Sequence, residues 1–158
     1  MNLKDNFLVE DVEELIKSKH LDAEIIWHEQ YGQKTEDAAE ALGVDKSSLV
    51  KSLIFIDEGG CPLMVIVTGN RRVDTKKVQK LAGSKVRIAN ADEVLKLTKH
   101  PVGGVPPIGL KIRTLVDNEL MQKDFVYSSA GSPHAGLKIH PKDLVKISKA
   151  EVCDVAER

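Results

Sequence analysis

The sequence predicts a single α/β domain of the α+β kind, in which helices pack outside a mixed and largely antiparallel sheet. Three observations carry this prediction. At 158 residues the chain has the length of one domain. Charged residues make up 30% of it and apolar residues 42%, which is ordinary for a globular protein. Segments with helical spacing alternate with short apolar strands, and no repeat, linker or low-complexity segment separates them.

Apolar spacing and turn residues place the elements of the N-terminal half. Thr35 is a plausible N-cap, Gly43 suits a helix end, and residues 58–61 suit a hairpin turn. The predicted elements are a helix over 8–16, a strand over 23–28, a helix over 36–42, and strands over 50–57 and 62–68.

The C-terminal half follows the same logic. Asp74 and Asn90 are expected N-caps, Glu93 completes a capping box with Asn90, and Pro141 can open a helical turn. The predicted elements are helices over 74–82, 90–99 and from 141, and strands over 86–89, 111–116, 124–128, 137–140 and 150–155. The strands over 124–128 and 137–140 should flank a turn over 129–136.

Composition excludes several function classes. The formal net charge is −1, so overall charge favours no polyanionic partner. Cys61 and Cys153 form neither a metal-type spacing nor a disulfide framework. The first residues lack the apolar core of a signal peptide, and no apolar run is long enough to span a bilayer. We therefore expect a cytoplasmic protein that binds no membrane.

The stretch Gly103 to Gly109, with sequence GGVPPIG, is the most informative part of the chain. Glycine allows tight turns and close approach of a ligand, whereas proline restricts the backbone. We expect a stiff surface loop that presents backbone N–H groups.

Lys51 lies within an apolar strand, on the same face as Leu53 and Phe55. One interpretation is a lysine whose stem packs on apolar surface while the ammonium reaches water. The other is a cationic anchor for a phosphate or a sugar hydroxyl at the mouth of a pocket.

Other candidates have a plain structural alternative. His28 is expected to be structural, and Trp27 and Phe55 are expected to be core residues. A basic cluster at the start of the helix over 74–82 is either a solvated face or a contact surface for tRNA phosphates. This cluster comprises Arg71, Arg72, Lys76, Lys77 and Lys80.

Six motifs in chain order resemble the YbaK and prolyl-tRNA synthetase editing-domain superfamily, over residues 22–155. They are TEDAAEALG at 35–43, VKSLIF at 50–55, GGVPP at 103–107, SAG at 129–131, GSPH at 131–134 and PKDL at 141–144. The resemblance implies one editing domain over residues 1–158 with a barrel-like sheet. It also implies hydrolysis of the ester between a mischarged amino acid and tRNA, often alanine or cysteine on proline tRNA.

The resemblance implies a catalytic role for Lys51, which would hold the terminal adenosine. Backbone N–H groups around Gly103, Gly104 and Val105 would stabilise the oxyanion of the ester, an effect worth ~2.7–4 kcal/mol per donor in other enzymes. The family relies on a substrate hydroxyl rather than on a side-chain base. No metal or organic cofactor is implied.

Substrate binding is assigned on the same basis to Pro107, Ser129, Gly131 and His134, which would shape the amino-acid pocket or position water. The implied partners are the acceptor end of aminoacyl-tRNA and prolyl-tRNA synthetase, with no DNA. Pro106 departs from the family pattern, because many relatives carry a small polar residue there.

Two other function classes remain as alternatives. One is a non-catalytic relative that binds tRNA or a synthetase. The other is a hydrolase of unrelated small esters, which the absence of a G-x-S-x-G motif disfavours.

Overall fold

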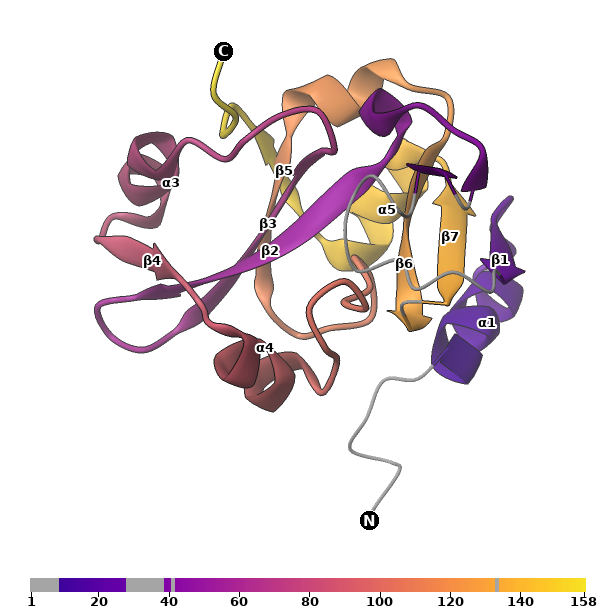
Figure 1. Cartoon of the computed structure of the whole chain (residues 1–158), viewed down its shortest axis with the longest axis horizontal. Coiled ribbons are helices and arrows are strands. Elements are labelled where there is room, and N and C mark those ends of the chain that lie inside the picture. Colours follow the sequence, from indigo (N-terminus) through magenta and orange to yellow (C-terminus); the bar gives the residue numbers. More distant parts are fainter. Residues whose placement is uncertain (1–8, 28–38, 41, 133) are drawn as a thin grey trace.

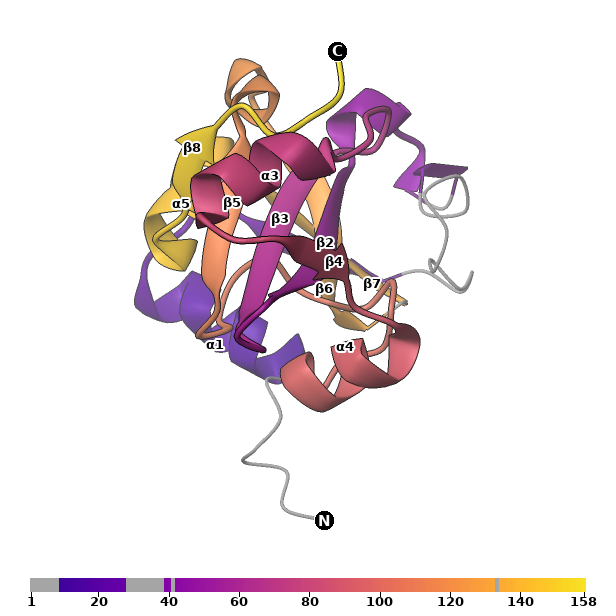
Figure 2. The same cartoon turned by 90° about the vertical axis from the view of Figure 1, so that its left-hand side faces the viewer.

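The computed structural model describes residues 9–27, 39–40, 42–132 and 134–158. It contains two sheets, with helices around them (Figures 1 and 2). The helices are α1 (Val9–Ser18), α3 (Thr75–Ala82), α4 (Ala91–Thr98) and α5 (Pro141–Ser148), with short 3-10 turns at η2 (Lys46–Ser48) and η3 (Asn118–Gln122).

The larger sheet has five strands in the order β4-β2-β3-β5-β8, and the smaller has three in the order β1-β7-β6. The strands are β1 (Glu24–Trp27), β2 (Val50–Asp57), β3 (Pro62–Thr68), β4 (Val86–Ile88), β5 (Arg113–Asp117), β6 (Val126–Ser132), β7 (Ala135–Ile139) and β8 (Glu151–Cys153). Pairing is antiparallel except for β3–β5 and β5–β8.

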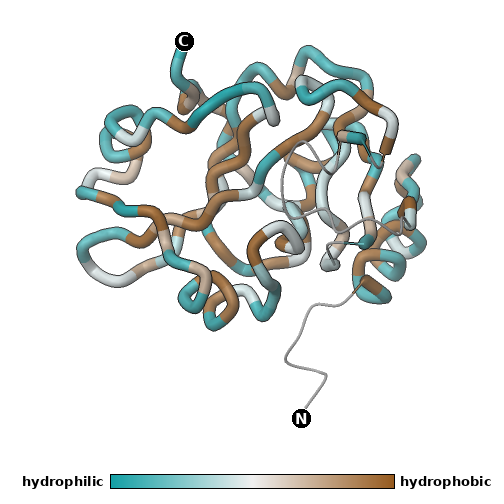
Figure 3. Tube along the Cα trace, viewed as in Figure 1, coloured by the Kyte–Doolittle hydropathy of each residue, from teal (hydrophilic) through white to brown (hydrophobic). Residues whose placement is uncertain are grey.

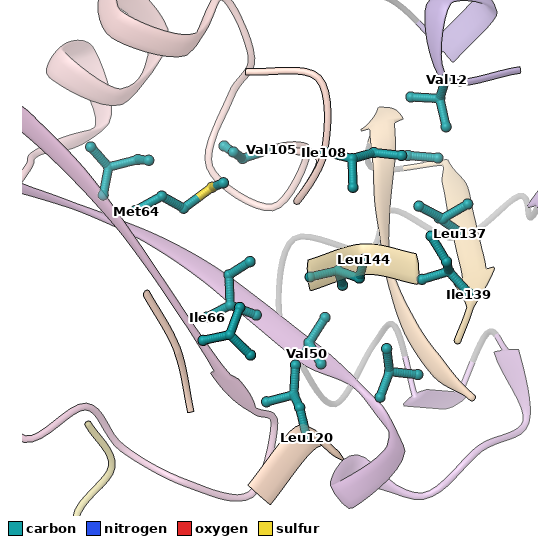
Figure 4. Packing of buried hydrophobic residues seen from close by; sticks show 14 of the residues in the cluster. Val12, Val50, Met64, Ile66, Val105, Ile108, Leu120, Leu137, Ile139 and Leu144 are labelled. Atoms are coloured by element: carbon teal, nitrogen blue, oxygen red, sulfur yellow. The ribbon is translucent and has the colours of Figure 1, made fainter. Parts of the chain in front are cut away.

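The expectation of a mixed, largely antiparallel architecture is therefore confirmed, but the sheet is not a barrel. It is split into two open sheets, which an isolated parallel bridge between Leu49 and Tyr127 joins. Apolar side chains, including Val105 and Ile108, form the main core together with residues of both sheets (Figure 4).

Side chains that alternate along β2 pack into two different cores. Val50, Ile54 and Ile56 belong to the main core, which also contains β6 and β7 residues. Phe55 and Leu53 belong to a second core, which packs the outer face of the sheet against Val78 of α3. Figure 3 shows the apolar residues concentrated along the central strands, because both faces of this sheet are covered.

Several local signals are confirmed. Asn90 and Glu93 form the expected capping box, and Pro141 occupies the first turn of α5. Arg87 also holds Glu93, and this ion pair with the Asn90 amide lowers the pKa of the Glu93 carboxyl to about 2. The edge strand at the C-terminus, β8, is also present.

The turn expected over 129–136 is wrong. Strand β6 continues to Ser132 and β7 begins at Ala135, with a register shift between Ser129 and Ser132. This irregularity accommodates Gly131, whose φ of +101° is a glycine conformation. The turn signals of the sequence thus mark a bulge within a strand.

Of the two aromatic residues predicted to be in the core, one is buried and one is exposed. Phe55 is a core residue, as expected, and is 4% exposed. The interpretation of Trp27 as core is wrong, because its exposed fraction is 61%. Trp27 is the last residue of β1, which is an edge strand of the smaller sheet. His28 and the Thr35 cap lie outside the described residues.

A polar cluster fixes the start of α5. The His140 ring donates to the carbonyl oxygen of Asp124, lies 3.0 Å from an Asp22 carboxylate oxygen, and stacks on Phe125. The hydrogen bond to Asp22, followed by that to Asp124, raises the pKa of His140.

Cys61 and Cys153 are free thiols. Within the described ranges, no helix has the length and apolar character needed to cross a membrane.

Candidate active site

The candidate site lies where the two sheets diverge. Leu49 and Tyr127 form a parallel bridge, so β2 and β6 leave this point in the same direction. Lys51 and Ser129 each lie two residues beyond this bridge, on strands that belong to different sheets. Because β4 pairs only with residues 55–57 of β2, Lys51 lies on the part of β2 that β4 leaves uncovered. Its side chain is half-buried.

Ser129 connects β6 to the glycine-proline segment. Its hydroxyl donates a short hydrogen bond to the carbonyl oxygen of Gly103. Gly103 has a φ of +85°, so its conformation is one that residues with a side chain adopt only with strain. The structure thus brings together Gly103 and Ser129, two residues that sequence analysis had placed in the same site from separate motifs.

A second connection involves His100, which sequence analysis missed. Its ring is 2% exposed, and Nδ1 lies 3.1 Å from the carbonyl oxygen of Gly131. A carbonyl oxygen only accepts, so Nδ1 is the donor and carries the hydrogen. Thr98 fixes the backbone at His100, because the Thr98 hydroxyl accepts from the His100 amide. The same hydroxyl lies within hydrogen-bonding distance of the Val94 carbonyl. The sequence signal was only the position of His100 directly before the loop.

The expectation that this loop lies on the surface is wrong. Residues 104–108 are all buried, and Ile108 is fully so. The apolar side chains Val105 and Ile108 anchor the segment in the main core (Figure 4). Pro107 is buried with them, so it stiffens the segment from within the fold.

The two amides expected as oxyanion donors differ. The Gly104 amide donates to the carbonyl oxygen of Pro101, 2.9 Å away, so the loop itself uses it. For the amide of Val105 the structure records no acceptor within the described part of the chain. The Val105 amide is therefore, of these two, the one that the loop does not itself use.

His134 lies at the exposed end of the β6–β7 hairpin, where its amide donates to the Ser132 hydroxyl at 3.2 Å. Trp27 pairs with the next residue, Ala135, so an exposed aromatic ring and an exposed imidazole flank the same hairpin end.

Two residues of the basic cluster form ion pairs within the protein. Arg71 makes a two-pronged contact with Glu119 at 3.0 and 3.2 Å, and this contact raises the Arg71 pKa. Lys77 pairs with Asp154. Arg72 and Lys76 are exposed. The turn that carries Arg71 and Arg72 adjoins the start of β2, because the Gly69 amide donates to the carbonyl oxygen of Leu49.

The family follows from comparison with known proteins. Residues 30–147 match the aminoacyl-tRNA editing domain, and the chain belongs to this family. It is 34% identical over 119 residues to the uncharacterized protein YwhH of Bacillus subtilis, covering 74% of this chain and 76% of that one. It is 25% identical over 145 residues to the Enterococcus faecalis protein named "Putative Cys-tRNA(Pro)/Cys-tRNA(Cys) deacylase EbsC", covering 90% and 88%.

Comparison of the fold with solved structures points to the same family. A crystal structure described as "a putative trans-editing enzyme for prolyl tRNA synthetase" superposes with a TM-score of 0.84 at 30% identity, covering 95% of this chain and 97% of that one. The resemblance drawn from the motifs is thereby confirmed at the level of family and fold.

Proposed function

We propose that this protein is an aminoacyl-tRNA deacylase that acts in trans, releasing alanine or cysteine from mischarged proline tRNA. The observation that supports it best is the hydrogen bond from Ser129 to Gly103, which ties the glycine-proline segment to β6, the strand that bridges to β2 two residues before Lys51. Family membership supports the same reaction class, and the name of the Enterococcus relative supports a cysteine substrate.

In the proposed reaction, water adds to the ester carbonyl, and the tetrahedral oxyanion collapses with release of the ribose oxygen as a hydroxyl. The Val105 amide would donate to the oxyanion, which is the charge that develops in the transition state. The Lys51 ammonium would hold the terminal nucleotide through its phosphate or ribose. A substrate hydroxyl, rather than a side-chain base, would orient the water.

Selectivity for small amino acids would come from the rigid surroundings of this point. The segment at 104–108 is buried and Ser129 ties it to β6, so the surface facing the amino acid cannot expand easily. One methylene changes the binding free energy of an amino acid in a synthetase pocket by only ~1–3 kcal/mol, so a synthetase attaches some smaller amino acids by mistake. A second site is then needed to remove them. His134 and Gly131 are proposed to border this pocket, and Arg72 and Lys76 to meet the tRNA backbone.

The test is a single-turnover deacylation assay with chelator present, on alanyl- and cysteinyl-tRNA for proline, with correctly charged prolyl-tRNA as the control. The expected result is release of alanine or cysteine well above the uncatalysed rate and no acceleration for proline. Binding of the tRNA without release of either amino acid would contradict the proposal and favour a non-catalytic tRNA-binding role.

A further inference from the structure

A pocket of about 880 Å³ begins at Gly109, the last residue of the glycine-proline segment, and contains none of Lys51, Val105 or Ser129. It is formed by the C-terminal ends of α1 and α5, the segment 109–114 that enters β5, and the start of β8. Figure 2 shows α1, α5 and β8 gathered on one side of the molecule. Pockets that hold small molecules in proteins have about 300–1,000 Å³, so this volume suits a small ligand.

The floor of this pocket is aliphatic. Its apolar lining residues are all partly buried against the main core. They are Leu15, Leu21, Leu110, Ile112 and Ile147. No Phe, Tyr or Trp lines the pocket among the described residues, so it offers no stacking surface for a nucleobase. A flexible hydrocarbon is the better match for such a floor.

The rim is positively charged. Five lysine or arginine side chains line the pocket together with two carboxylates, an excess of three positive charges. These residues are Lys19, Lys111, Arg113, Lys146 and Lys149, with Asp143 and Glu151. Glu151 is already paired with Arg113 at 2.9 Å, so lysines dominate the remaining charge.

The helix ends do not cancel this charge. The C-terminal end of each helix carries about half a negative charge, and α1 and α5 both end here. Some terminal carbonyls are already satisfied, because the amides of Lys19 and Lys149 donate to the carbonyl oxygens of Leu15 and Val145. About one negative charge in total is smaller than the excess from the side chains. The pocket therefore attracts an anion.

We propose that this pocket binds a small amphiphilic anion, with an aliphatic chain on the floor and one carboxylate or phosphate headgroup among the lysines of the rim. This ligand is distinct from the tRNA ester proposed above. Because the pocket contains none of Lys51, Val105 or Ser129, either proposal can fail without the other.

Calorimetric titration with decanoate, decyl phosphate, decanol and inorganic phosphate, all below micelle-forming concentrations, tests the ligand class. Saturable one-site binding is expected for decanoate and decyl phosphate. Decanol lacks the anionic headgroup and inorganic phosphate lacks the aliphatic chain, so each should bind at least about tenfold more weakly. The tighter of the two anions identifies the headgroup. Absence of saturable binding for both anions, or equal binding of decanol, would overturn the proposal.

A charge-reversal pair locates the site. Lys19→Glu with Lys146→Glu should weaken binding of the better anion by about tenfold or more. Lys80→Glu with Lys96→Glu makes the same charge change near the ends of α3 and α4, outside the pocket, and should leave affinity within about twofold. Equal losses in the two double variants would show a nonspecific charge effect and refute the location. Lys19→Gln with Lys146→Gln provides a milder version if the first pair does not fold.

Discussion

The hydroxyl of Ser129, on the edge strand β6 of the smaller sheet, donates to the carbonyl oxygen of Gly103 in the glycine-proline segment. This contact spans 26 positions of the chain and ties the glycine-proline segment to β6. It makes the position of the Val105 amide depend on a strand in the smaller sheet. The predictions below follow from this arrangement and from the charges around it.

Ser129→Ala should lower both stability and deacylation. It leaves the Gly103 carbonyl without this donor, which costs about 1–3 kcal/mol of unfolding free energy, and it loosens the loop that positions the Val105 amide. Ser128→Ala is the matched control, because the Ser128 hydroxyl donates only to the carbonyl of the next residue. Chemical denaturation and single-turnover rates measure the two effects. Equal behaviour of the two variants would contradict this role.

Gly103→Ala should be more damaging to activity than Gly104→Ala. The φ of +85° at Gly103 strains any side chain by about 1–2 kcal/mol, whereas Gly104 has no positive φ. Because the loop is buried, both variants should also lose some stability. The loss of activity is separated from the loss of stability by comparing rates at equal folded fraction, which is measured by circular dichroism. A Gly103→Ala protein with full turnover would show that the strained turn does not position the oxyanion donor.

Lys51→Ala should slow deacylation by about 10- to 150-fold, because it removes charge-assisted contacts of roughly 1.5–3 kcal/mol. Lys85→Ala, which removes an exposed lysine far from β6, is the control. Lys51→Met retains the apolar stem, so it tests the alternative that the stem alone matters. A wild-type rate in Lys51→Met would support that alternative.

Trp27 gives a direct readout of tRNA binding, since it is the single tryptophan of the chain and is exposed beside the hairpin that carries His134. Binding of the acceptor end should change its emission, because bases stack on exposed aromatic rings. Trp27→Ala should weaken tRNA binding with little loss of stability. Fluorescence that does not respond to saturating tRNA would place the acceptor end elsewhere.

His140 should make stability depend on pH. Its pKa is raised above the ordinary 6.5, chiefly by the hydrogen bond to Asp22 and then by that to Asp124, with Asp143 adding to both. Protonated His140 is therefore favoured in the folded state. Its contribution is full below pH 6.5 and is lost as pH rises through the higher folded value.

The measurement is the unfolding midpoint of wild type and His140→Gln between about pH 5 and about pH 9. The difference should be largest at acidic pH and shrink above pH 6.5. Asp22→Asn should reduce the pH dependence in the same way. A difference that stays constant across this range would rule out the linkage to His140.

Most of the fold could be predicted from local patterns. The capping box at Asn90, the hairpin of β2 and β3, and the proline at the start of α5 all depend on neighbours within a few residues. The division into two sheets could not be predicted in this way. It depends on contacts between segments distant in the chain, such as the packing of Val105 and Ile108 in one core with residues of β2 and β6.

The candidate site shows the same limit. The motifs named Lys51, Gly103 and Ser129, but their mutual placement required the bridge at Leu49 and Tyr127. The sequence suggested an exposed loop because glycine and proline are typical of surface turns. Tertiary packing overrode that expectation, and it also buried His100, whose role no local pattern revealed.

Burial of residues 104–108 has a consequence for how a substrate reaches this site. A segment whose side chains form part of the core cannot swing aside as a lid, because opening would expose apolar surface at about 25 cal/mol per Å². The proposed ester substrate would therefore meet a surface that exists before it arrives. Selection among amino acids would then occur at the encounter itself, by shape, and variants that change selectivity should alter the walls of the pocket rather than the length of this loop.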